Sequence, residues 1–350
     1  GGTSIMAIID KPTDYFNTKL YTGNGGTQSI TGVGFQPDFN WTKSRTTTQS
    51  HVLTDAVRGV TKTLFTNATQ AEATLSGITA FGTDGYTLGA SDLWSENSTS
   101  FASWNWLGAN GTASNTTGSI DSTVSANTTS GFSIVSYAGN STAGATIGHS
   151  LGVAPKMIIV KDRDGADSWV VYHNSLAITE YLILNSTSAA LTDNEVIFYD
   201  TDPTSSVFTV GAHNTVNQSG HNYIAYCFAE KQGYSKFGSY TGNGSTDGTF
   251  VYTGFKPAFV MIKATGLVKN WLTFDNRRLG YNGAGTNKQL HPNTNGTESS
   301  GNGTTLDILS NGFKTRTTDS DENGSGQNYI YMAFAENPFV ASNFVPTTAR

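Results

Sequence analysis

A short motif recurs three times along this 350-residue chain, and this recurrence limits the folds that the chain can adopt. The three versions are Tyr21-Thr22-Gly23-Asn24, Tyr137-Ala138-Gly139-Asn140 and Tyr240-Thr241-Gly242-Asn243. After each version comes a proline with a lysine six positions beyond it, at Pro37 and Lys43, Pro155 and Lys161, and Pro257 and Lys263. Regular recurrence is typical of chains built from copies of one structural unit. The sequence therefore predicts three copies of a unit of about 100 residues.

The residues after each proline, and those that close each copy, have the patterns of β-strands. Phe39-Asn40-Trp41-Thr42 alternates apolar and polar residues, which predicts a half-buried strand. Met157 to Val160 is continuously apolar, which predicts a central strand covered on both faces. The closing segments are Phe101 to Trp106, Asn222 to Glu230 and Asn328 to Glu336, and the last two also predict central strands.

The spacing of these strands predicts the fold class and the domain boundaries. Short strands divided by turn residues, with 39 glycines in the chain, favour an all-β fold. We expect three tandem β-sandwiches of jelly-roll or concanavalin-like type, with equivalent cores in series, over residues 6–112, 130–233 and 234–350. The Gly/Ser/Thr/Asn-rich stretch 113–129 is expected to be a linker or long loop. One helical turn is expected near Thr69 to Leu75, and Met6 is typical of a native start.

Composition argues against several classes of partner. The net charge is −6 and no basic run is present, so nucleic acid is not expected to bind. No stretch approaches the roughly 18 apolar residues of a membrane span, so membrane insertion is not expected. The single cysteine, Cys227, lies in an apolar run and is predicted to be a buried thiol.

One segment resembles the opening of a calcium-binding loop. Asp319, Asp321 and Asn323 alternate along the chain and Gly324 follows at the sixth position, which is the spacing that such loops use. Ile330 stands at the twelfth position, where these loops carry a bidentate glutamate. The three residues are therefore a candidate calcium site, with a solvated hairpin tip as the alternative. No other cofactor is expected.

The sequence carries no convincing catalytic motif. Gly148-His149-Ser150-Leu151-Gly152 has the letters of a serine-hydrolase elbow, but a predicted strand follows where the elbow needs a helix. We therefore expect no enzymatic activity. Aromatic residues near predicted loop tips, such as Trp94 and Tyr281, are candidates for stacking on sugar rings, with packing onto their own domain as the alternative.

Several segments together resemble an uncharacterised β-rich domain family. They are Asp14 to Thr18, Tyr21 to Gly25, Gly32 to Phe39 and Tyr331 to Phe339, and the resemblance extends over nearly the whole chain. The family is associated with virion structural proteins of tailed bacteriophages, especially marine ones, that are often described as tail-fibre-like. It has no assigned catalytic residues. The middle copy departs most from the other two, with Ala138 and Ser141 in place of Thr and Gly.

The resemblance implies a bacteriophage virion structural protein, such as a tail fibre or receptor-binding component that contacts host-surface glycan. It implies assembly in the host cytoplasm, a place on the virion surface, other virion proteins as partners, and a homo-oligomer, with a trimer favoured. The alternatives are a capsid-decorating or tail structural protein with only virion partners, a polysaccharide depolymerase, and a bacterial adhesin.

Overall fold

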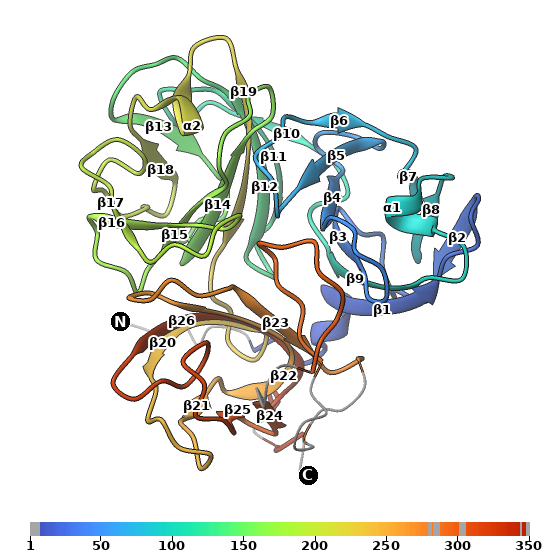
Figure 1. The fold of residues 1–350 in the computed structure, drawn as a ribbon. Coiled ribbons are helices and arrows are strands. Elements are labelled where there is room, and N and C mark those ends of the chain that lie inside the picture. The colour runs from blue at the N-terminus through green and yellow to red at the C-terminus, as the bar shows by residue number, and fades with distance from the viewer. Residues whose placement is uncertain (1–7, 279–281, 283–287, 301–305, 344, 348–350) are drawn as a thin grey trace.

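The computed structural model describes residues 8–278, 282, 288–300, 306–343 and 345–347. The fold is all-β, as predicted: antiparallel strands form several sheets. Figure 1 shows three lobes around a common centre. The first lobe carries β1 to β9, the second carries β10 to β19, and the third carries β20 to β26. In the described residues the helices are single turns, and none has the length and apolar character of a membrane span.

The first lobe consists of a large sheet and a small one. The large sheet has the order β1 (Phe16–Thr22), β9 (Ser100–Trp106), β3 (Phe39–Ser44), β4 (Val52–Asp55), β5 (Lys62–Phe65) and β6 (Ala73–Thr74). The small sheet has the order β2 (Gln28–Thr31), β8 (Gly85–Leu88) and β7 (Ile78–Gly82). A 3-10 turn, η1 (Pro12–Asp14), precedes β1, and the helical turn α1 (Asp92–Ser95) precedes β9.

The second lobe has the same two layers. Its large sheet has the order β10 (Ala113–Asn115), β11 (Ser122–Asn127), β12 (Phe132–Ala138), β19 (Asn222–Phe228), β14 (Met157–Asp162), β15 (Val170–His173), β16 (Glu180–Ile183) and β17 (Leu191–Thr192). Its small sheet pairs β13 (Ala145–Gly148) with β18 (Val207–Val210), and the helical turn α2 (Asn214–Asn217) precedes β19.

The third lobe repeats the arrangement in the part of the chain that the structure describes. Its large sheet has the order β20 (Ser235–Thr241), β26 (Asn328–Pro338), β22 (Phe255–Ala264) and β23 (Leu272–Asp275). Its small sheet has the order β21 (Phe250–Tyr252), β25 (Gly312–Thr315) and β24 (Leu306–Leu309). Pro257 cannot donate to the ladder, and it lies at a bulge where the register of β22 against β26 shifts.

The recurring motif occupies the same place in all three large sheets. In each sheet the strand that carries the motif pairs with the closing strand, which pairs in turn with the strand that carries the recurring lysine. The motif tyrosine always faces an aromatic residue of the closing strand, and the two rings stack. The pairs are Tyr21 with Phe101, Tyr137 with Tyr223 and Tyr240 with Tyr329, with ring centroids 5.1, 5.2 and 5.0 Å apart.

The central strands of each large sheet are buried on both faces, because one face packs on the small sheet of its own lobe and the other faces the centre of the molecule. In β14, Ile158 and Val160 belong to a core shared with the small sheet of the second lobe. Met157 and Ile159, which point the other way, belong to a core shared by all three lobes. The prediction of central strands covered on both faces is confirmed for β14, β19 and β26.

The central core is a cluster of aromatic side chains from three distant parts of the sequence. The ring of Trp106 in the first lobe lies 6.4 Å from Phe228 in the second lobe and 5.5 Å from Phe334 in the third. Phe228 and Phe334 lie 5.9 Å from each other. The expectation of equivalent cores in series is therefore incomplete: each lobe has a core between its own two sheets, and the lobes also close around a further core that all three share.

Three further expectations also need correction. Residues 113–129 are not simply a linker or loop, because they contain β10 and β11, which extend the large sheet of the second lobe beside β12. Thr69 to Leu75 contains no helix but the short strand β6. β3 is fully buried rather than half-buried, because Asn40 bonds the side chain of Asn105 at 2.8 Å inside the lobe.

Candidate functional site

The recurring motif is a structural turn, in which the tyrosine, the asparagine and the glycine each have one role. The tyrosine hydroxyl donates to a carbonyl of the turn that precedes the closing strand, at Trp94 O, Val216 O and Glu322 O, over 2.9, 2.8 and 2.7 Å. The asparagine Oδ1 accepts from the backbone two residues on, at Gly26, Thr142 and Ser245. A Cβ on the glycine would lie 2.3 to 2.4 Å from a backbone oxygen, at Glu96, Gln218 and Gly324. The sequence motif therefore marks a contact between two turns.

The recurring lysine is also a structural residue. Lys43, Lys161 and Lys263 are fully buried, and each Nζ donates to the next carbonyl along the chain, over 2.6, 2.6 and 2.9 Å. Each also donates to the carbonyl four residues on, at Thr47, Gly165 and Leu267. Burial lowers the pKa of each amine to about 8. Each buried lysine thus stabilises the turn that follows it by donating to two of its carbonyls.

The calcium candidates lie in the turn that the motif of the third lobe contacts. Asn323 is buried, its Oδ1 accepts from Asn243 N at 3.1 Å, and its Nδ2 donates to Thr317 O at 2.7 Å. Asp321 pairs with Lys269 at 2.7 Å, and Asp319 Oδ1 accepts from Asp321 N at 2.9 Å. One side-chain oxygen of each of these three residues is thus already bonded to another group of the protein. Calcium binding here stays a prediction.

Asn323 has a counterpart that explains its position. Asn217 of the second lobe uses the same atoms in the same way, since Asn140 N donates to its Oδ1 at 2.8 Å and its Nδ2 donates to Gly211 O at 2.9 Å. Among the described residues, no group of three or more His, Cys, Asp or Glu side chains is arranged to hold a metal ion.

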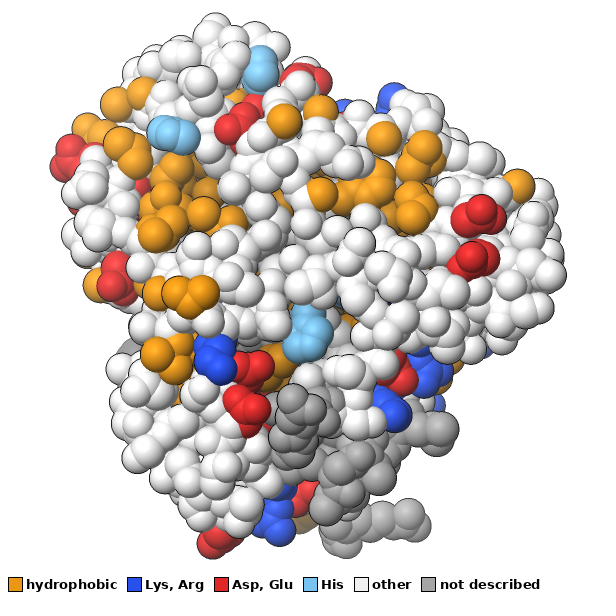
Figure 2. Space-filling model, in the orientation of Figure 1, with side chains coloured by type: hydrophobic (Ala, Val, Ile, Leu, Met, Phe, Trp, Pro, Cys, Tyr) orange, Lys and Arg blue, Asp and Glu red, His pale blue; other side chains and the backbone are white. Residues whose placement is uncertain are grey.

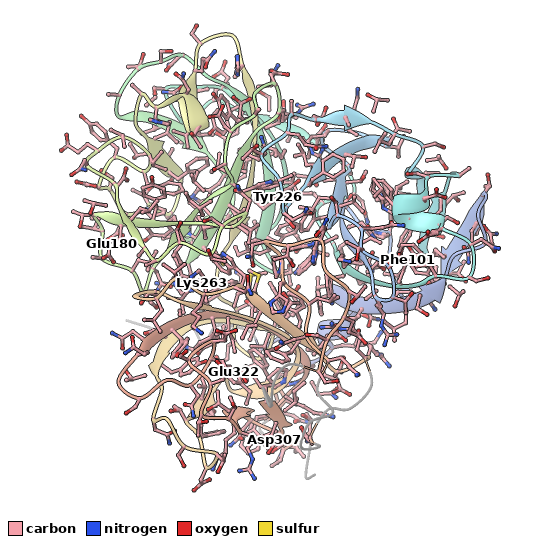
Figure 3. The ribbon with its side chains drawn as sticks, viewed as in Figure 1. Phe101, Glu180, Tyr226, Lys263, Asp307 and Glu322 are labelled. Atoms are coloured by element: carbon pink, nitrogen blue, oxygen red, sulfur yellow. The ribbon has the colours of Figure 1, made fainter. Side chains whose placement is uncertain are left out.

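Networks of buried charge join the lobes to each other. At the junction of the first and second lobes, Arg58 pairs with Asp55 at 2.5 Å and with Glu72 at 3.0 Å. Glu72 also pairs with Arg163 of the second lobe at 3.1 Å, and Asp55 accepts from the hydroxyl of Tyr226 at 2.7 Å. Figure 3 shows Tyr226 on the side of the second lobe that faces the first.

The junction of the third and first lobes is built in the same way. Arg278 pairs with Asp275 at 2.6 Å and with Glu298 at 3.5 Å, and Glu298 pairs with Arg45 of the first lobe at 2.8 Å. Trp104 of the first lobe donates from its indole nitrogen to Asp275 at 3.0 Å. Two of the three junctions therefore hold matching networks.

The junction of the second and third lobes is different, because among the described residues it has no buried network of ion pairs. His173 stands where the others have Asp55 and Asp275, since these residues end β15, β4 and β23 opposite Met157, Phe39 and Phe259. Its Nε2 lies 3.1 Å from Tyr331 O. Ala190 N donates to Thr265 O at 2.7 Å. At the other two junctions the equivalent backbone hydrogen bonds run from Glu72 N to Arg163 O and from Glu298 N to Arg45 O. Burial lowers the pKa of His173 to about 4.

Tryptophans also connect successive lobes. Trp169 of the second lobe donates to Phe65 O of the first at 2.8 Å, and Trp271 of the third lobe donates to Ile183 O of the second at 3.0 Å. The two ends of the described chain meet as well, since Ser342 N donates to Asp10 Oδ1 at 2.6 Å. The lobes are thus linked in a closed ring.

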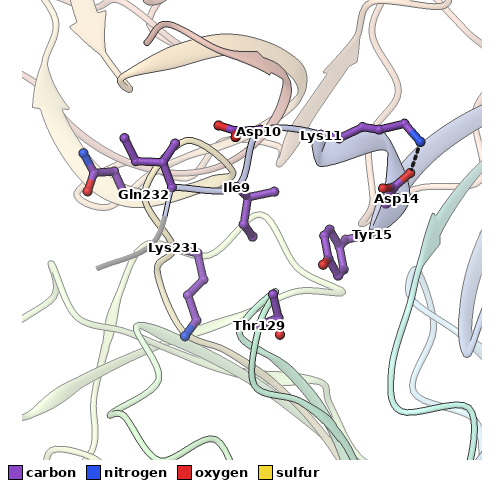
Figure 4. Close-up of a pocket in the computed structure, with 9 residues that line it drawn as sticks. Ile9, Asp10, Lys11, Asp14, Tyr15, Thr129, Lys231 and Gln232 are labelled. Atoms are coloured by element: carbon purple, nitrogen blue, oxygen red, sulfur yellow. Dashed lines mark ion pairs between the residues drawn. The ribbon is translucent and has the colours of Figure 1, made fainter. Parts of the chain in front are cut away.

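A groove of about 660 Å³ lies between the second and third lobes. Lys156 lies on the second lobe, Glu230 and Lys231 lie on the segment between β19 and β20, and Lys236 in β20 and Tyr252 lie on the third lobe. A neighbouring hollow of about 410 Å³ shares Ile8, Lys231 and Gln232 with this groove. Figure 4 shows Lys231 beside Gln232, with its amine extending toward Thr129.

Sequence reasoning missed this groove and selected other aromatic residues. Trp94 is fully buried in the core of the first lobe, so it cannot stack on a ligand in this structure. Tyr281 lies outside the described residues. Tyr252, with 58% of its surface exposed, was missed because its strand resembles any other short alternating strand. Cys227 is buried as predicted, and burial raises the pKa of its thiol.

Figure 2 shows that the face seen in Figure 1 is mostly backbone and uncharged polar side chains, with charged groups in small clusters of mixed sign. A protein with two-layered β-lobes around an aromatic core is the class that these observations define. The chain belongs to the family described as a domain of unknown function (DUF7483), whose family model matches residues 11–338. Comparison with curated proteins and with solved structures gave no match.

Proposed function

We propose that the chain consists of three tandem copies of one β-sandwich unit of jelly-roll or concanavalin-like type. The recurring strand order, the stacked tyrosine of each motif and the buried lysine of each copy support this interpretation. In each copy a large sheet packs on a small one, which is the arrangement of a sandwich.

We propose further that the protein is a non-enzymatic structural component of a bacteriophage virion, at the virion surface, in a tail fibre or receptor-binding assembly. The resemblance of the sequence to tail-fibre-like proteins supports this function. The observation that best supports this function is the bonding of the recurring polar residues. They bond to turn carbonyls or to the adjacent lobe, and so they stabilise a rigid body.

Labelling of virions tests this function. Antibodies against the chain, applied to purified virions of a phage that encodes it, are expected to mark the tail in electron micrographs. Label on the head would overturn the tail-fibre proposal in favour of capsid decoration. Absence of the chain from purified virions, measured by mass spectrometry, would overturn both.

The proposed oligomer has its own test. A homotrimer is the assembly expected of a fibre component, because symmetric closed oligomers are common among such proteins. Sedimentation equilibrium is expected to give three times the 37.1 kDa of the chain. A concentration-independent monomer would contradict the trimer.

A further inference from the structure

The groove between the second and third lobes carries a positive charge that opposes the charge of the whole protein. Lys156, Lys231 and Lys236 line it against one carboxylate, Glu230, whereas the net charge of the chain is −6. Glu230 pairs with Lys236 at 2.8 Å. Among the described residues, Lys156 and Lys231 have no ion-pair partner, so two cationic groups remain available to an anion.

Lys231 stands where its ammonium group could form an ion pair with a bound anion. It lines both the groove and the neighbouring hollow, so it stands where the two meet. Partial burial lowers the pKa of this amine, because water solvates its charge less well than it would a surface lysine. A bound carboxylate would compensate for that lost solvation.

The groove also offers an apolar surface for a ring. Tyr252 lies in the edge strand β21 and is 58% exposed. Gly254 follows two residues later at a φ of +81°, a conformation that favours glycine. Nearby Gln232 carries a hydrogen-bonding amide. An aromatic face with amide and ammonium groups beside it is a combination that suits a charged sugar.

We propose that this groove binds an acidic saccharide, with Lys156 and Lys231 contacting its carboxylate groups and Tyr252 packing on a sugar ring. This inference rests on the proposed contact with host-surface glycan and specifies the class of glycan and the site. Binding is measured on the purified chain without virions. Its failure is therefore distinct from failure of the virion labelling.

The test uses an array of oligosaccharides in matched pairs, in which uronate- or sialate-bearing sugars are compared with neutral counterparts of the same length. We expect acidic members to bind at least about tenfold more tightly than neutral ones, since hydrogen bonds between an ammonium and a carboxylate are stronger than those between neutral groups. Binding is expected to weaken as salt rises from 50 to 500 mM, because salt screens exposed charges.

Variants assign the binding to the groove. Lys156→Gln with Lys231→Gln is expected to reduce affinity for acidic members at least about tenfold, and Tyr252→Ala is expected to reduce it as well. Lys62→Gln and Phe250→Ala are matched controls, because Lys62 lies in the first lobe and Phe250 is exposed on the same strand as Tyr252 outside the groove. The controls should leave affinity unchanged.

Three results would overturn the proposal: no binding to any acidic member, equal binding of acidic and neutral members, or undiminished binding by the lysine variant. Thermal unfolding of every variant checks that the fold is retained. If Tyr252→Ala unfolds, Tyr252→Leu keeps an apolar side chain without the aromatic ring and tests the same contact.

Discussion

Buried ion pairs fix how neighbouring lobes sit against each other. Arg58 is buried between Asp55 and Glu72, and both carboxylates also bond to the second lobe. Such networks contribute little net stability compared with apolar packing, but removing one member leaves the other charges buried and unpaired. The chain contains its own alternative without buried ion pairs at the junction of the second and third lobes.

We therefore expect Arg58→Leu to lower the free energy of unfolding by about 3–5 kcal/mol. A variant that copies the uncharged junction, with Asp55→His, Arg58→Leu, Glu72→Ala, Arg163→Thr and Tyr226→Met, should lose less stability than Arg58→Leu alone. Urea unfolding measures both. A loss under about 1 kcal/mol for Arg58→Leu would contradict the role assigned to the network.

His173 should make the protein sensitive to acid. Burial lowers its pKa to about 4 in the folded protein, against roughly 6.5 in an unfolded chain. Between these values the unfolded state binds the proton and the folded state does not, so stability is complete above about pH 6.5 and falls as the pH drops toward 4. The largest loss of folding stability that this residue can cause on acidification is about 3 kcal/mol.

Urea unfolding at pH 7 and at pH 4.5 tests this effect. His173→Gln should lose less stability between the two pH values than the unaltered protein does. His221 is the control with the opposite sign, because its hydrogen bond to Asp162 raises its pKa. That bond stabilises the fold below the unfolded pKa and weakens as the pH rises through the folded value, so His221→Gln should increase acid sensitivity. Equal acid sensitivity of His173→Gln and the unaltered protein would be inconsistent with a buried neutral His173.

At the scale of single elements, turns and strands differ in how far the sequence predicts them. The motif turns were located correctly because glycine, asparagine and tyrosine have fixed tasks there. β10 and β11 were missed because their residues are small and polar, and they form strands only through pairing with β12. β3 looked half-buried because Asn40 and Thr42 are polar, yet they bond to each other inside the lobe. The groove could not be predicted, since its lining comes from two lobes.

The motif turn is expected to be intolerant of even one added methyl group. A Cβ at Gly139 would lie 2.3 Å from Gln218 O, so Gly139→Ala must displace one backbone segment and should cost about 1–3 kcal/mol. Gly266→Ala is the matched control, because nothing lies within 4 Å of its Cβ position. Thermal unfolding should show a lower midpoint for Gly139→Ala only. Equal midpoints for the two variants would rule out a tight contact between the turns.

At the scale of the whole molecule, the sequence indicated three copies but not how they meet. Its apolar patterns show which strands are buried on both faces. They do not show whether the second face is covered by another sheet of the same copy or by a neighbouring copy. The structure selects the second arrangement for one face of each large sheet, where Trp106, Phe228 and Phe334 meet. We therefore expect the lobes to depend on each other for stability.

Differential scanning calorimetry of the full chain tests this dependence directly. If the three lobes share one core, unfolding should be a single transition whose calorimetric enthalpy equals the van't Hoff enthalpy. For 350 residues that enthalpy is about 250 kcal/mol near 60 °C. Two or three separable transitions, or a calorimetric enthalpy about three times the van't Hoff value, would mean that the lobes unfold independently and would contradict a shared core.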